Sequence, residues 1–209
     1  MTSGLVPSGG EARPAYGVLH VIHGHGGGTE HHARALIDAS RNRYRHYLAI
    51  AVGERWQMEA HGDDGSMRAF EFSRQEGETW PVFVAGVCAT FGVDVLHLHN
   101  ISGCRDGIIE ALAALDLSYG YTVHDFSFAC PTILFLGVDG MYCGAQTDAG
   151  FCARCLAAQR PFAEIDIIAW RARHRALLAR AAFLVAPSRW NLSRASASPW
   201  PIAATFPRI

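Results

Sequence analysis

GVLHVIHGHGGGTEHHARALIDAS, from Gly17 to Ser40, is the stretch that decides the fold. Its first seven residues, ending at His23, form an apolar, β-branched run that stops at glycines, which predicts a buried strand. Gly24 to Gly28 predict a tight turn, and Thr29 is placed to cap a helix that runs to about Ser40. A strand, a glycine turn and a helix in this order predict the first unit of an α/β domain.

The same alternation continues along the chain. Further strands are predicted at 47–52, 67–72, 93–98, 119–124 and 183–186, and further helices at 80–91, 104–115 and 165–181. Because the strands are apolar on both faces and alternate with helices, we expect a Rossmann-like, doubly wound and mostly parallel sheet. The segment 126–159 has little periodicity and is expected to be a cysteine-bearing loop insertion.

Composition limits the class of protein. The 209 residues suit one α/β domain, and a half-hydrophobic chain with 18% charged residues can bury a full core. The net charge of -1 gives no electrostatic reason to expect a nucleic-acid partner. We interpret 1–14 as a disordered lead-in and 15–209 as the domain. Without a signal-peptide core or a membrane-spanning run, a cytoplasmic location is expected, with at most peripheral contact at the inner face of the membrane.

The glycine turn is the first candidate for chemistry. Gly26, Gly27 and Gly28, followed by Thr29, lie where a backbone can approach a phosphate and where a helix begins. A tight turn that needs positive φ angles explains the same glycines equally well. The dinucleotide fingerprint does not fit, because Thr29 occupies its third glycine position. Glu54, after the second strand, nevertheless keeps a ribose-binding nicotinamide enzyme as an alternative.

Polar residues at two strand ends form the second candidate. His99 and Asn100 directly follow one predicted strand, and His124 and Asp125 lie at the end of the next. Carboxyl ends of parallel strands are where open α/β sheets bind ligands. Such side chains can bind sugar hydroxyls or a phosphate, although for any one histidine by itself a hydrogen bond to loop carbonyls is the favoured explanation.

The irregular segment carries the third candidate, a group of thiols. Six cysteines in an intracellular chain indicate thiols or metal ligands before disulfides. Four thiolates can hold zinc tetrahedrally and staple a loop, with free thiols and disulfides as the alternatives. Cys88 and Cys104 are expected to be ordinary buried side chains. The predicted zinc ligands are Cys130, Cys143, Cys152 and Cys155.

The helix predicted at 165–181 is rich in basic residues. These side chains could form a face that contacts anionic lipid or a lipid-phosphate acceptor. A solvated surface is the alternative. The residues are Arg171, Arg173, His174, Arg175 and Arg180.

Taken together, these segments resemble the N-terminal domain of the retaining family-four glycosyltransferases of the GT-B fold. The turn 27–30 (GGTE) resembles the family's Gly-Gly-x-Glu turn, and 95–100 (VLHLHN) resembles its strand ending in His-Asn. The segment 122–126 (TVHDF), with Cys130-Pro131 and the later cysteines, resembles a subgroup with a His-Asp strand end. The segment 185–188 (VAPS) resembles the strand and serine turn near the end of that domain.

The resemblance implies a role for each motif. His124 and Asp125 would be the catalytic residues, with His124 donating a hydrogen bond to charge that develops near the transferred sugar. His99, Asn100 and Glu30 would contact the substrate on the acceptor side. The diphosphate of a nucleotide-sugar donor would lie against Gly26, Gly27, Gly28 and Thr29.

The resemblance also implies partners. The acceptor would be a glycan or a lipid-linked glycan. Most donor contacts would come from a C-terminal domain that the sequence lacks, because 205–209 resembles the interdomain linker. Transferase activity is therefore not expected of these residues by themselves.

Overall fold

The computed structural model of the chain describes residues 16–101 and 107–186. The expectations for the lead-in, for Cys104, for the VAPS turn beyond 186 and for the linker lie outside these residues. The strands are β1 (Gly17–His23), β2 (Arg45–Val52), β3 (Arg55–His61), β4 (Met67–Ser73), β5 (Val95–Leu98), β6 (Ser118–Thr122) and β7 (Phe183–Val185). The helices are α1 (Gly28–Ser40), α2 (Trp80–Phe91), α3 (Ile108–Ala114), α4 (Ala149–Ala157), the short 3-10 helix η1 (Arg160–Phe162) and α5 (Ile167–Arg180).

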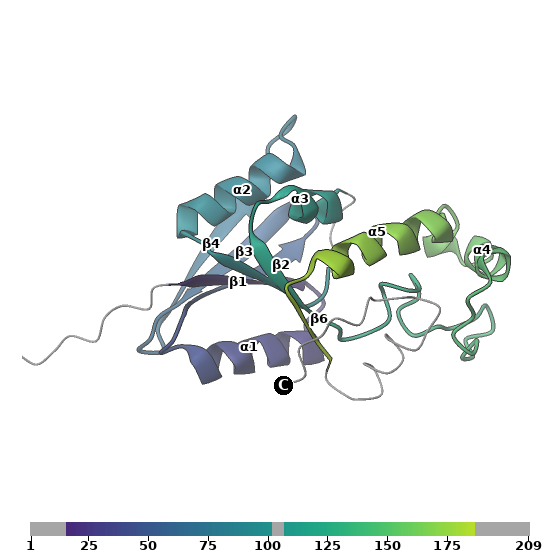
Figure 1. Cartoon of the computed structure of the whole chain (residues 1–209), viewed down its shortest axis with the longest axis horizontal. Helices are drawn as coiled ribbons and strands as arrows, with labels where there is room; N and C mark the ends of the chain where they lie inside the picture. Colours follow the sequence, from purple (N-terminus) through teal and green to yellow (C-terminus); the bar gives the residue numbers. More distant parts are fainter. Residues whose placement is uncertain (1–15, 102–106, 187–209) are drawn as a thin grey trace, which may run out of the picture.

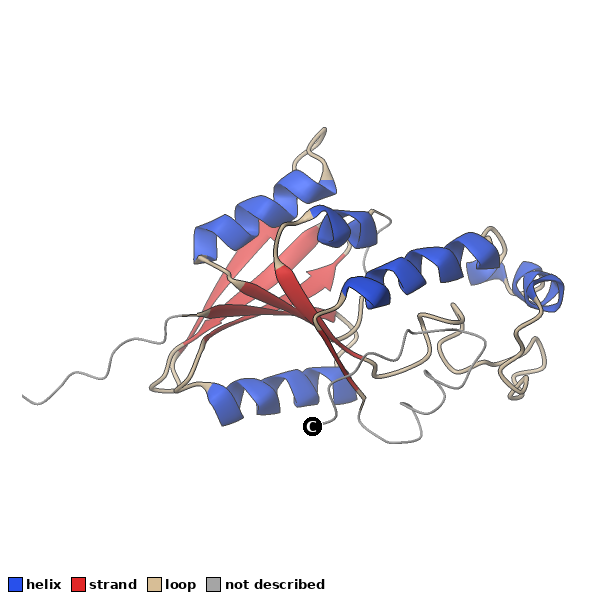
Figure 2. Ribbon diagram, in the orientation of Figure 1, coloured by secondary structure: helices blue, strands red, loops and turns tan. Residues whose placement is uncertain are grey.

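The strands form one mixed, mostly parallel sheet in the order β4-β3-β2-β1-β5-β6-β7. Neighbouring strands in the part β2-β1-β5-β6-β7 pair in parallel. Strands β3 and β4 pair antiparallel at the edge beside β2. Helix α1 lies on one face of the sheet, and α2, α3 and α5 lie on the other (Figures 1 and 2). The predicted α/β class with a mostly parallel sheet is confirmed, and the arrangement is compatible with a Rossmann-like fold.

The order of the strands creates a switch point between β1 and β5. From β1 the chain continues through α1 to β2 on one side, and it later returns to β5 on the other side. The connections α1 and α3 lie on opposite faces of the sheet (Figure 1). In open α/β sheets, ligands bind in the crevice beyond the carboxyl ends of the strands at such a point. The fold therefore directs attention to the ends of β1, β5 and β6.

The two faces of the sheet are packed differently. The large apolar core lies on the face covered by α2, α3 and α5 and includes Leu19, Leu96 and Leu112. Under α1 the apolar cluster is small, consisting of Ile22, Ala33, Ile37 and Leu48, with Ile50 packed against it. The remainder of this face carries buried imidazoles. They belong to His20, His46, His97 and His99, each at most 6% exposed.

Three local features differ from the sequence expectations. Strand β3 was not predicted, and Thr29 does not cap α1, because Gly27 is the N-cap and Thr29 lies within the helix. The segment 126–159 contains α4, whose N-cap Asp148 accepts a hydrogen bond from the amide of Phe151. Between β6 and α4 the chain is otherwise irregular apart from a single bridge between Leu136 and Tyr142.

Helix α5 does not present all its basic residues to solvent. Arg171 and His174 are buried, 6% and 2% exposed. The exposed basic side chains of α5 are Arg173, Arg175 and Arg180. Membrane contact through this smaller face stays a prediction. Within 16–101 and 107–186, none of the helices combines the length and the apolar character that crossing a bilayer requires.

Candidate functional site

The ends of β5 and β6 meet at the carboxyl edge of the sheet, and their polar residues contact one another. Asn100 donates a hydrogen bond from Nδ2 to Oδ2 of Asp125, whose Oδ1 accepts one from the amide of Ser127 at 2.8 Å. His99 Nδ1 and His124 Nε2 lie 3.3 Å apart. The structure therefore brings the two strand ends into one hydrogen-bonded group, with Asp125 held from two sides.

The glycine turn lies beside this group at the N-terminus of α1. Gly26 and Gly27 have φ angles of 67° and 80°, in the left-handed region that favours glycine. A Cβ atom on Gly27 or Gly28 would meet nothing within 4 Å, so a ligand has room to approach the backbone here. No side chain caps α1, which leaves its first amides available to an anion.

Glu30 remains beside the turn but has a cationic partner. Its Oε1 accepts from Nε of Arg34 at 2.8 Å, and Arg34 also forms a bidentate pair with Glu59 at 2.7 and 2.9 Å. The other carboxylate oxygen of Glu30, Oε2, would lie 3.7 Å from a Cβ on Gly26. Glu30 can therefore contact a ligand in the turn, although it shares the single positive charge of Arg34 with Glu59.

A chain of hydrogen-bonded imidazoles connects the site with the far end of α1. Ser40 Oγ lies 3.1 Å from His46 Nε2, and His46 Nδ1 lies 3.0 Å from His20 Nε2. His20 Nδ1 then lies 3.0 Å from His99 Nε2, whose ring reaches His124 as described above. The imidazole chain, Ser40-His46-His20-His99-His124, thus crosses the face of the sheet beneath α1.

The direction of the imidazole chain follows from its first member. The hydroxyl of Ser40 donates to the carbonyl of Leu36 at 2.6 Å, so Ser40 Oγ accepts from the Nε2–H of His46. A neutral imidazole carries one N–H, so each following ring must also carry hydrogen on Nε2. His124 accordingly donates to His99 through Nε2. Its Nδ1 has no hydrogen-bond partner among the described residues and is left as an acceptor.

Burial keeps these rings neutral. Loss of hydration, together with a smaller effect of neighbouring histidines, lowers the pKa of His97 and of His124 to about 4. For His124, the charge of Asp125 acts in the opposite direction. Burial, followed by the neighbouring imidazoles, holds the pKa values of His20 and His99 far below the ordinary range. At pH 7 the rings therefore serve as donors, acceptors or ligands without net charge.

Sequence reasoning missed His32, His20 and His46. The ring of His32, on α1, packs edge-on against His124 and His99, with centroids 5.1 and 5.6 Å apart. The available signal was the total of eleven histidines, together with ionisable residues inside apolar strand segments. Helix α1 thus contributes a side chain to the site as well as its amides.

The four loop cysteines remain thiols in the structure. The described cysteines form no disulfide. Cys152 Sγ accepts a hydrogen bond from Arg171 at 3.3 Å, and Cys155 Sγ accepts one from Gln159 at 3.3 Å. Cys130 contacts the hydroxyl of Thr132 at 3.2 Å. In 16–101 and 107–186, the sets of three or more potential ligands within 4.8 Å of one another are formed by histidines.

Zinc at the loop cysteines stays a prediction. Ligands about 2.3 Å from one tetrahedral ion lie about 3.8 Å apart, so the sulfurs would have to move closer together to bind zinc. Ile133, Phe135 and Ala145 have φ angles of 68°, 57° and 53°, which are unfavourable for residues other than glycine. A metal that cross-links the loop would help to hold this conformation.

We expect about one equivalent of zinc on sulfur ligands in protein purified without chelator, measured by metal analysis. The sulfur-bound zinc, identified by its Zn–S distance of about 2.3 Å, should be lost from Cys152→Ser/Cys155→Ser and retained in Cys88→Ser. Less than about a tenth of an equivalent in the wild type, with all thiols reactive in denaturant, would contradict the prediction.

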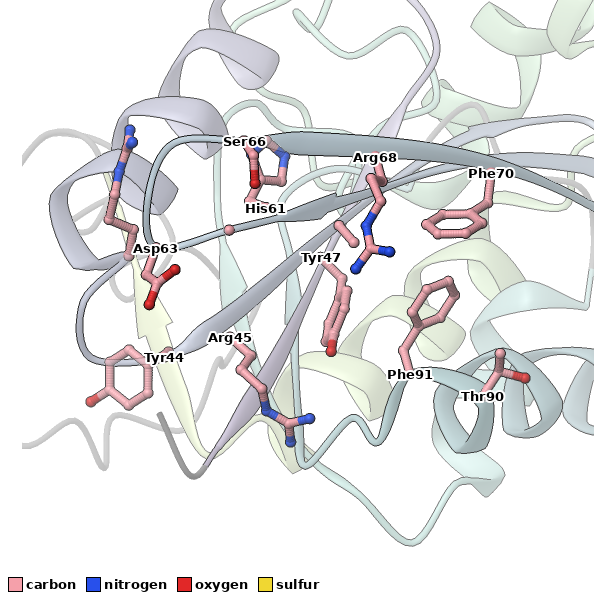
Figure 3. A pocket seen from close by; sticks show the side chains of 13 residues that line it. Tyr44, Arg45, Tyr47, His61, Asp63, Ser66, Arg68, Phe70, Thr90 and Phe91 are labelled. Atoms are coloured by element: carbon pink, nitrogen blue, oxygen red, sulfur yellow. The ribbon is translucent and has the colours of Figure 1, made fainter. Parts of the chain in front are cut away.

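A second pocket lies away from this site, at the amino end of β2 (Figure 3). Its volume is about 270 Å³. Arg45 and Arg68 point toward the same space as the rings of Tyr47 and Phe91 (Figure 3). Nη2 of Arg45 already donates to the carbonyl of Gly92 at 3.1 Å and lies 3.6 Å from Asp94. Asp63 also lines the pocket, so the lining does not define an anion site. The pocket lies at the edge of the sheet opposite the switch point, so it does not belong to the candidate site.

The fold and the site together define an α/β protein with a histidine-rich group at the switch point of its sheet. Comparison with family models, curated proteins and solved structures gave no match. Functional inference for this chain therefore rests on the geometry of the site.

Proposed function

We propose that the chain is the acceptor-side domain of a retaining glycosyltransferase that uses a nucleotide-sugar donor. One observation carries the proposal: the uncapped glycine turn and the hydrogen-bonded ends of β5 and β6 lie together at the carboxyl edge of the sheet, beside the switch point. Amides at a helix start suit a diphosphate, and adjacent imidazole, amide and carboxylate groups suit sugar hydroxyls.

Each residue has a role in this proposal. The amides following Gly27 bind the diphosphate. His124, once its single hydrogen has moved from Nε2 to Nδ1, donates a hydrogen bond to the charge that develops at the sugar. Asp125, fixed by Asn100 and Ser127, accepts hydrogen bonds from hydroxyl groups. Buried His99 supports the ring of His124 from behind. The acceptor is a glycan or a lipid-linked glycan, and a second α/β domain supplies the remaining donor contacts.

A nucleotide-binding oxidoreductase or binding domain is the second candidate. The mostly parallel sheet and the position of Glu54 just beyond β2 favour it. Glu54 Oε2, however, accepts from Nε of Arg74 at 2.6 Å, which reduces its capacity to bind a ribose. The proposed transferase function therefore gives a role to more residues of the site than the oxidoreductase function does.

Binding measurements separate the two candidates. In titration calorimetry of these 209 residues, we expect no affinity for NAD and, at most, weak millimolar binding of nucleotide-sugars. Binding of a nucleotide-sugar is expected to be weak because, in this proposal, these residues contact mainly its diphosphate. Micromolar binding of NAD would favour the oxidoreductase, and micromolar binding of a nucleotide-sugar would contradict the need for a second domain.

Turnover of the complete polypeptide tests the role of His124. We expect His124→Ala to lower kcat by about 10²–10³-fold, the range seen when one donor to a developing charge is removed. The free energy of unfolding should change little, because His124 is only half-buried. His31→Ala, an exposed position on α1, is the matched control and should retain wild-type kcat. Near-normal turnover of His124→Ala would remove His124 from the site.

A further inference from the structure

Three imidazoles from three different elements converge at the candidate site. His32 comes from α1, His99 follows β5 and His124 follows β6, and one ligand nitrogen of each lies within 4.8 Å of the others. We propose that His32, His99 and His124 bind a divalent late-transition ion, with Zn²⁺ as the probe. Imidazole is a preferred ligand of such ions, and three protein ligands leave a fourth position open. This inference is independent of the proposed transferase function.

The imidazole chain prepares His99 as a ligand. His99 Nε2–H donates to His20 Nδ1 at 3.0 Å, so the lone pair of His99 is on Nδ1, the atom that faces His124. Metal-binding histidines are commonly fixed by a hydrogen bond from their second nitrogen. His20 supplies that bond here, and it is oriented in turn by His46 and Ser40.

Binding needs only one change at His124. The hydrogen on its Nε2, which points at His99 in the metal-free protein, moves to Nδ1, and the Nε2 lone pair then faces the ion. The ring remains neutral and no proton is released. Asp125 lies close enough to act on the charge of His124, so its carboxylate partly offsets the charge of the ion. His32 and His124 are both half-buried, which gives the ion a path from solvent.

A competing triad shares one ring with this site. His20, His97 and His99 also place ligand atoms within 4.8 Å of one another, and all three are buried. Here the ion would have to displace the hydrogen bond between His20 Nδ1 and His99 Nε2. His20 and His97, like His32, border a cavity of about 450 Å³ whose described lining includes no carboxylate, whereas His124 of the open triad lies beside Asp125. An ion at the buried triad would therefore lack compensating charge, and the open triad is favoured.

X-ray absorption of the zinc-loaded chain identifies the ligands directly. To exclude the loop cysteines, the measurement uses Cys152→Ser/Cys155→Ser protein carrying one equivalent of Zn²⁺. We expect a first shell of nitrogen and oxygen at about 2.0–2.1 Å. A first shell dominated by sulfur at about 2.3 Å, or no retained zinc after dialysis, would overturn the proposal.

Variants locate the ion. His32→Ala and His124→Ala should each weaken Zn²⁺ binding at least about 100-fold in the same background, since even outer-shell changes cost about 10–100-fold. His31→Ala and His97→Phe should bind as tightly as the parent. Circular dichroism and thermal unfolding of each metal-free variant show that it is folded. Loss of binding in His97→Phe, with retention in His32→Ala and His124→Ala, would assign the ion to the buried triad and overturn the proposal.

Discussion

Replacement of Arg171 by alanine is expected to lower the free energy of unfolding by about 3–5 kcal/mol. The guanidinium, only 6% exposed, donates to the carbonyls of Ala129, Thr147 and Gln146 and to the sulfur of Cys152, at 2.9 to 3.3 Å. Each buried acceptor left without a donor costs about 1–3 kcal/mol, and water entering the space would recover part of this. Urea unfolding at pH 7.5 measures the loss.

The matched control is Arg175→Ala, an exposed position on the same helix. It should change the free energy of unfolding by no more than about 0.5 kcal/mol. Arg171→Lys should recover only a fraction of the stability, because an ammonium group cannot reproduce the planar fork that serves several acceptors. A cost below about 1 kcal/mol for Arg171→Ala would show that the loop is held by other contacts.

Acidification is expected to destabilise the protein well above the pH at which its carboxylates titrate. Burial, with the charges of His32 and His124, lowers the pKa of His97 from 6.5 to about 4. Between these values the unfolded chain binds more protons than the folded one, so stability is fully present above pH 6.5 and falls as the pH drops toward 4. His97 by itself contributes about 3 kcal/mol, and the buried rings of His20 and His46 act in the same direction.

Urea unfolding between pH 7.5 and 4.5, with a chelator present to exclude metal effects, measures this dependence. His97→Gln keeps a hydrogen-bonding group opposite Thr122 but cannot titrate, so its stability should fall less steeply with decreasing pH. His31→Gln should retain the wild-type slope. The pKa of the paired carboxyl of Glu59 is lowered from 4.5, so the stability that it contributes is present throughout this window and is lost only at more acidic pH. A flat profile from pH 6.5 to 4.5 would contradict the assignment of neutral buried imidazoles.

Local sequence signals predicted most elements but missed β3, α4 and the short 3-10 helix η1. The bounds of β1 and α2 agree with the prediction, since a continuous apolar run and a helical segment ended by a glycine are strong local signals. Strand β3 (RWQMEAH) has Trp56 and Met58 at alternate positions, but its polar residues and length gave a weak pattern. Helix α4 was missed because the segment 126–159 was judged to have little periodicity, and a helix of nine residues gives only a short local signal.

The sequence by itself determined which residues end the strands at the carboxyl edge, and therefore the position of His99, Asn100, His124 and Asp125. It could do so because strand alternation and glycine turns are local properties of the chain. It could not determine that His20, His46 and His97 share a face beneath α1, or that Arg171 turns into the cysteine-bearing segment. Those facts depend on which strands become neighbours and in what register, and that choice is made by packing between residues far apart in sequence. A neutral imidazole tolerates burial only when another group completes its hydrogen bonds, so the imidazole chain exists only in the assembled sheet.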